Sequence, residues 1–114
     1  MKKYVKTNIP DATHIKFEVV YCKGGMNMFT YKDEPRGIYL CLSPVELKDK
    51  GSYMSETYTA FTGGKTLIKA MARKSDKAIE KAWDKLNDCS EKIINLFEQG
   101  KYSEIKELIQ SMKF

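Results

Sequence analysis

Apolar and polar residues alternate along short runs in the first half of the chain. In residues 14–22 (HIKFEVVYC) every second residue is apolar, the pattern of a β-strand with one buried face. Glycine, proline and aspartate residues separate this run from three further candidates: residues 26–32, 37–43 and 53–61. Because the connections are short, we expect the four strands to pair as an antiparallel meander between about residues 14 and 62.

The apolar period changes from two to about 3.6 after Lys65, which predicts helices from there to about residue 113. The pattern fits either one long helix that ends near Gly100 or two helices separated at residues 74–76, with Ser75 or Asp76 as the cap of the second. A short last helix is predicted from Ser103. The apolar stripe of the long helical part is formed by Ile68, Met71, Ala78, Ala82, Leu86, Cys89, Ile93 and Phe97.

These patterns together predict a single α+β domain over residues 1–114. Its sheet is a four-stranded antiparallel meander, and a long helix, continuous or broken, and a short C-terminal helix pack on one face of that sheet. A chain of 114 residues is long enough to bury about two-thirds of its unfolded surface without disulfides or metals.

Composition is that of a water-soluble globular protein, with 42% hydrophobic and 31% charged residues. The longest uninterrupted apolar run, residues 38–42, is far shorter than the roughly 20 residues that span a bilayer. Lysines at the start of the chain are not followed by an apolar segment, so no secretion signal is indicated. We therefore expect a cytoplasmic protein without a membrane partner.

Residues that carry catalysis or bind metals are sparse. Cys22, Cys41 and Cys89 are far apart and odd in number, which fits neither a disulfide framework nor a zinc site, so we expect them to be reduced and apolar. His14 is the only histidine, and no nucleophile or acid and base pair accompanies it. The sequence therefore predicts a protein that is not an enzyme and that needs no cofactor or metal.

Residues 59–66 (TAFTGGKT) invite comparison with a phosphate-binding P-loop. The last three residues match the pattern G-x-x-x-x-G-K-[ST], but Thr59 stands where the leading glycine belongs. A nucleotide hydrolase also needs a later strand that ends in a metal-binding acid, and the pattern predicts no strand after Thr66. We interpret this segment as a strand-to-helix turn with affinity for anions, and we expect no tight binding or hydrolysis of ATP or GTP.

Positive charge is concentrated just after this turn. Residues 63–77 hold five Lys/Arg and one Asp/Glu, in a chain whose net charge is +5. On a helix, basic residues at every fourth position form a ridge, and glycine amides at the helix start add hydrogen-bond donors. The predicted anion-binding or nucleic-acid-binding residues are Gly63, Gly64, Lys65, Thr66, Lys69, Arg73, Lys74 and Lys77.

Three interpretations of this basic ridge stay open. Lysines on an exposed helix are most often a solvated surface. The first functional hypothesis is non-enzymatic binding of nucleic acid or another polyanion. The second is a protein-interaction or inhibitory module, which docks on an acidic protein surface or forms a homodimer through an exposed apolar face. The two differ in salt response, because only the first depends strongly on counterion release.

Two segments carry a resemblance to other proteins: GGMNMFTYKDEPRGIYLCLSPVE and YTAFTGGKTLIKAMARKSDKA. They resemble segments of uncharacterised small proteins carried on bacterial phages and conjugative elements. The resemblance covers about residues 15–80 and includes no motif with known chemistry, so it transfers no functional residues. It implies a bacterial cytoplasm and an accessory or inhibitory role.

Overall fold

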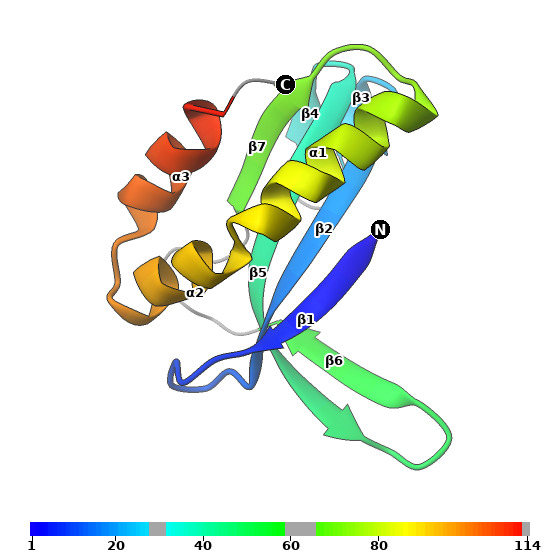
Figure 1. Cartoon of the computed structure of the whole chain (residues 1–114). Coiled ribbons are helices and arrows are strands. Elements are labelled where there is room, and N and C mark those ends of the chain that lie inside the picture. The colour runs from blue at the N-terminus through cyan, green and yellow to red at the C-terminus, as the bar shows by residue number, and fades with distance from the viewer. Residues whose placement is uncertain (28–31, 59–65, 113–114) are drawn as a thin grey trace.

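The computed structural model describes residues 1–27, 32–58 and 66–112 (Figure 1). Antiparallel strands and helices make up this part of the chain, which confirms the predicted mixed α+β class. The described elements, in chain order, are β1 (Lys2–Lys6), β2 (His14–Cys22), β3 (Gly25–Asn27), β4 (Lys32–Glu34), β5 (Gly37–Asp49), β6 (Met54–Tyr58), β7 (Thr66–Met71), α1 (Asp76–Asp88), α2 (Ser90–Glu98) and α3 (Tyr102–Gln110).

The main sheet has five strands around β5, and it is not the predicted meander. β2 pairs directly with β5, and β1 lies outside β2. Val45 has His14 as its partner on one side and Tyr58 on the other, so β6 lies on the edge of β5 opposite β2. β7 pairs with the first half of β5 on that same edge. β3 and β4 form a separate two-stranded sheet, and the end of β5 with β6 projects as an arm (Figure 1).

Residues 66–71 form strand β7, so the prediction that the helical part begins at Lys65 is wrong. Ile68 is buried, Lys69 is exposed and Ala70 is again partly buried, which is the alternation of a strand. The physical reason is the long central strand. The first half of β5 needs a hydrogen-bonding partner on the edge away from β2, and β7 supplies it.

Strand β1 has no counterpart among the predicted strands, the first of which begins at His14. Its lysine-rich sequence is typical of an edge strand, where charged side chains reach solvent. Lys3 also ties this strand to the helices, since its Nζ donates to Asn87 Oδ1 and to Ser90 Oγ and lies 5.6 Å from the ring centroid of Phe17. A single extra strand at the edge thus joins the sheet to the junction of α1 and α2.

Two local signals mark helix boundaries correctly, Ser75 at the start of α1 and Gly100 after the end of α2. Ser75 caps α1 by accepting a hydrogen bond from the Ala78 amide at 3.1 Å, so one of the two predicted cap residues is correct, although β7 and not a first helix precedes it. Gly100 follows α2 with a φ of 72°, a left-handed conformation that glycine adopts without strain. The predicted long helix is instead divided at Cys89, between α1 and α2, where the Cys89 Sγ donates to the carbonyl of Lys85.

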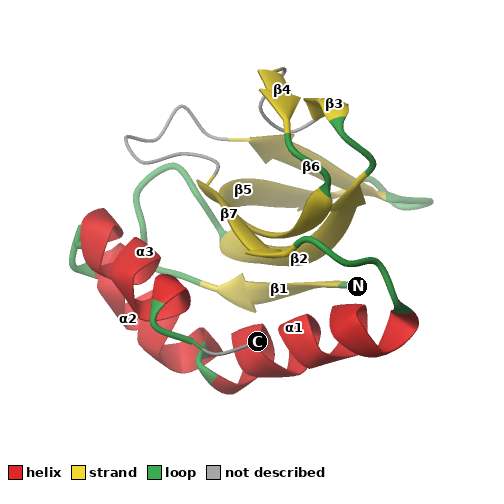
Figure 2. Cartoon of the chain, turned by 90° about the horizontal axis from the view of Figure 1, so that it is seen from above, coloured by secondary structure: helices red, strands yellow, loops and turns green. Residues whose placement is uncertain are grey.

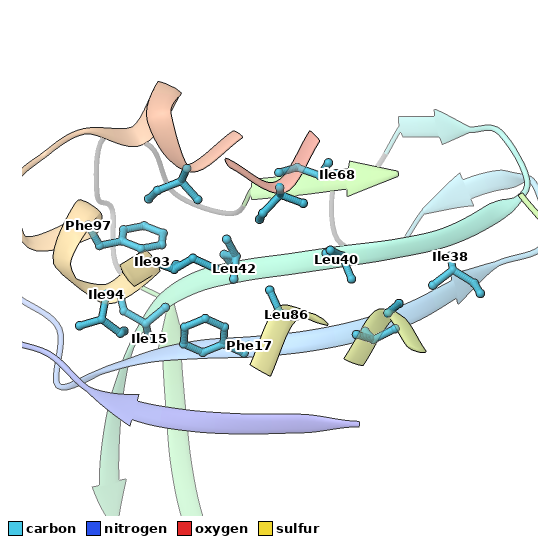
Figure 3. Close-up of a cluster of buried hydrophobic side chains, with 14 of the residues drawn as sticks. Ile15, Phe17, Ile38, Leu40, Leu42, Ile68, Leu86, Ile93, Ile94 and Phe97 are labelled. Carbon is cyan, nitrogen blue, oxygen red and sulfur yellow. The ribbon is translucent and has the colours of Figure 1, made fainter. Parts of the chain in front are cut away.

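The helices cover one face of the sheet (Figure 2) and close a single core against it (Figure 3). Alternate residues of β2 and β5 point into this core and meet the apolar faces of α1 and α2. The fully buried side chains in Figure 3 include Ile15, Phe17, Leu40, Leu42, Leu86, Ile93 and Phe97.

Trp83 lies on α1, is partly buried and packs against the core. Because it is the only tryptophan, its fluorescence reports on the contact between α1 and the sheet. We expect the emission maximum to shift to longer wavelength when the protein unfolds in urea. An emission maximum that stays constant through the loss of helical circular dichroism would contradict this placement.

The other face of the sheet buries a cluster of charges. Lys16 is only 7% exposed, and its Nζ lies 2.9 Å from Glu56 and 3.1 Å from Glu18. Tyr4 donates to the second oxygen of Glu56, and Ser43 is the register partner of Lys16 on β5. Glu56 belongs to β6, so this cluster fastens the projecting arm to β1 and β2.

Cys41 lies beside this cluster, and its thiol should make the free energy of unfolding decrease at alkaline pH. Burial, helped by the charge of Glu18, raises the pKa of the Cys41 thiol from 9.0 to about 12. The folded chain therefore holds this proton more tightly than the unfolded chain. The resulting stabilisation is complete below pH 9 and is lost as the pH rises towards 12, by at most about 1.4 kcal/mol per pH unit.

We therefore expect the urea midpoint to fall more steeply between pH 9 and 11 in the wild-type protein than in Cys41→Ala. The variant has a lower midpoint at neutral pH because it leaves a small cavity, so the test is the slope with pH and not the midpoint itself. Equal slopes would show that the Cys41 thiol does not contribute to the alkaline loss.

Candidate nucleic-acid interface

The structure distributes the predicted binding residues over three kinds of element. Thr66 and Lys69 belong to β7, Arg73 and Lys74 to the connection that follows it, and Lys77 to the first turn of α1. The predictions for Gly63, Gly64 and Lys65 fall outside the described residues.

The predicted helical ridge is therefore wrong, because Lys69 and Arg73 do not share a helix with Lys77. The strand-to-helix turn is wrong as well, since the segment after Lys65 is a strand and the next helix begins at Asp76. Spacing by four places side chains together only on a helix. Whether these residues are neighbours therefore depends on how the strands of the sheet pair.

Strand register brings these residues to one end of the sheet together with two that were not predicted. Cys22 pairs with Gly37, and Ile38 pairs both with Tyr21 and with Met71. The residues just beyond these pairs are therefore neighbours at the upper end of the sheet in Figure 1. We call this region the basic end and define it by Lys23, Arg36, Lys69, Arg73, Lys74 and Lys77.

Side-chain contacts confirm that the segments of the basic end touch. Lys74 Nζ lies 4.9 Å from the ring centroid of Tyr21, a cation–π contact between the β7–α1 connection and β2. The backbone and Cβ of Arg36 lie next to Gly24, and the stem of Lys69 lies against Gly37. Charges from five separate segments are thus gathered at one end of the molecule.

The charge of this region is unbalanced. Residues 20–27, 32–36 and 69–77 hold seven Lys/Arg and three Asp/Glu, an excess of four positive charges, against +5 for the whole chain. None of the six basic-end side chains forms an ion pair with any residue that the structure describes. An excess of exposed, unpaired cations produces a positive potential that attracts anions.

Lys23 and Arg36 could not be predicted from the sequence, because their place in the basic end depends on the order of the strands. In a meander, residues 14–22 would pair with residues 26–32 and would not align Cys22 with Gly37. The only local signal is that both cations flank turn residues, Lys23 before Gly24 and Arg36 after Pro35. That signal predicts exposure but says nothing about which charges become neighbours.

Gly37 lets β7 approach β5 closely at the basic end, so a larger residue at this position should lower stability. A Cβ at this position would lie 2.5 Å from the Met71 carbonyl oxygen and 2.9 Å from Lys69 Cε. The carbonyl belongs to a paired strand and cannot move aside freely, so Gly37→Ala should destabilise the protein by about 1–3 kcal/mol. Urea unfolding measures this, and an unchanged midpoint would contradict the close approach of β7 to β5.

Comparison with family models, curated proteins and solved structures found no match to this chain. The resemblance to proteins of phages and conjugative elements therefore stays a prediction. Within the described residues, no group of three or more His, Cys, Asp and Glu side chains is placed to hold a metal ion. No helix in that part of the chain is long and apolar enough to cross a membrane.

Proposed function

We propose that this protein is a non-enzymatic binding protein whose basic end binds nucleic acid. The supporting observation is the gathering of six cations from five segments without ion pairs among the described residues. Phosphate contacts from Lys and Arg supply most of the affinity of such proteins and need no particular fold.

The charge arrangement also argues against a merely solvated surface. Two exposed lysines outside the basic end, Lys48 and Lys101, have acidic partners in Glu46 and Glu104. At the basic end the pairing of Cys22 with Gly37 instead brings Lys23 and Arg36 next to one another, and like charges this close cost free energy unless an anion neutralises them. A phosphate backbone offers that neutralisation.

Retention on immobilised single-stranded DNA, duplex DNA and RNA at about 50 mM salt tests this proposal. For a duplex, each neutralised phosphate contributes about −0.9 to the slope of log affinity against log salt, so six contacts give a slope of about −5. Absence of retention on all three nucleic acids at low salt would overturn the proposed function.

A second candidate function, contact with another protein, rests on the projecting arm. Its tip exposes two large apolar side chains, Tyr53 at 63% and Met54 at 58%. Such an arm suits an accessory or inhibitory module, or a homodimer, and its binding would change little with salt. Sedimentation at increasing concentration, with Tyr53→Ser as the comparison, distinguishes self-association through this tip from nucleic-acid binding.

A further inference from the structure

Part of the outer edge of β2 is open. β1 pairs with residues 14–18 only, and the last contact is the Val19 amide, which donates to the Met1 carbonyl at 3.1 Å. Beyond this point no described strand pairs with β2 on that side. In an antiparallel strand every second residue points its amide and carbonyl to the same edge. Since Val19 faces the β1 edge, the N–H and C=O of Tyr21 also face that edge.

A pocket of about 450 Å³ lies along this open edge. Its lining includes Val20, Tyr21, Lys23, Gly24 and Met26. The volume is within the range of about 300–1,000 Å³ that small-molecule sites occupy. Met26 is 64% exposed, which is unusual for a large apolar side chain and provides an apolar wall beside the open backbone groups.

This pocket adjoins the basic end. Lys23 belongs to both, and Lys74 reaches the ring of Tyr21 from the β7–α1 connection. Arg36, in the connection between β4 and β5, lies next to Gly24. An apolar wall, a backbone donor and acceptor, and several cations therefore stand within one small region.

We infer that the ligand of the basic end is a single-stranded nucleic acid, one base of which enters the pocket at the open edge of β2. This inference rests on the proposed function. An unpaired base offers an apolar face to Met26, hydrogen-bonding groups to the Tyr21 backbone and a neighbouring phosphate to Lys23 and Lys74. A duplex keeps those base edges paired, so it offers the basic end phosphates alone.

The test compares a fluorescently labelled ten-nucleotide DNA strand, the matching RNA strand and the DNA duplex by anisotropy at about 100 mM salt. We expect the single strands to bind at least about tenfold more tightly than the duplex, because base contacts add to the phosphate contacts. Met26→Ala should weaken single-strand binding by about five- to tenfold and leave duplex binding unchanged. Met54→Ala, an exposed methionine on the distant arm, is the matched control.

Hydrogen exchange provides a second readout that does not depend on a variant. The Tyr21 amide should exchange quickly in the free protein and become protected when the single strand is added. Equal affinity for duplex and single strand without protection of Tyr21 would overturn the inference and leave the proposed function intact. If neither nucleic acid binds and a polyglutamate peptide does, both the inference and the proposed function fail.

Discussion

Lys16→Met is expected to lower the free energy of unfolding by about 3–5 kcal/mol at neutral pH, because it removes the cation from a buried charge cluster. Lys16 is 7% exposed and lies within 3.1 Å of two carboxylates. Methionine preserves most of the apolar stem, so the loss comes from leaving Glu18 and Glu56 as neighbouring negative charges. Urea unfolding followed by circular dichroism measures the change.

The matched control for this variant is Lys48→Met. Lys48 also contacts a carboxylate at 2.9 Å, that of Glu46, but its side chain is 62% exposed. Solvent screens such a pair, so the control should change stability by less than about 1 kcal/mol. Similar losses in the two variants would show that burial does not determine the strength of the Lys16 cluster.

Neutralising one carboxylate gives a further check on the same cluster. In Lys16→Met, Glu18 and Glu56 remain as neighbouring negative charges, so adding Glu56→Gln should restore part of the stability at neutral pH. A double variant that is less stable than Lys16→Met would instead indicate that Glu56 acts mainly through Tyr4.

Much of the fold could be predicted from local sequence patterns, because each of those patterns is compatible with only one kind of secondary structure. Strict alternation in residues 14–22 fixed which face of β2 is buried, and Ser75 and Gly100 marked helix ends through their own backbone chemistry. Residues 66–71 are compatible with either a helix or a strand. Over these six residues, Ile68 and Met71 fit a helical spacing whereas Ile68 and Ala70 fit a strand, and pairing with β5 decides between the two.

The candidate site shows the same division between local and long-range information. Lys69, Arg73, Lys74 and Lys77 are close in sequence, so a charge count was enough to single them out. Their geometry could not be predicted, because it depends on where β7 ends and not on a helical period. The addition of Lys23 and Arg36, and the open edge of β2, depend on strand order, which short-range patterns do not contain.

Arg36→Glu combined with Arg73→Glu is expected to weaken nucleic-acid binding by about 50-fold or more at 0.1 M salt. Each phosphate contact contributes about 0.9 log units at that concentration, and two are lost. The new carboxylates also repel phosphates, so the loss should exceed this value. Both side chains are exposed and lie outside the core, which leaves the fold intact. The slope of log affinity against log salt should decrease in magnitude by about 2.

The matched control for this charge reversal is Lys92→Glu combined with Lys106→Glu. It changes the net charge by the same amount at exposed positions of α2 and α3, two helices that carry none of the basic-end residues. Both double variants lose the same long-range electrostatic attraction for nucleic acid. Any larger effect of the arginine variant must therefore come from local phosphate contacts. We expect the control to weaken binding by less than about threefold, since distant charges are screened at this ionic strength. Equal losses in the two double variants would show that only the net charge of the protein attracts nucleic acid, and the basic end would no longer be its binding surface.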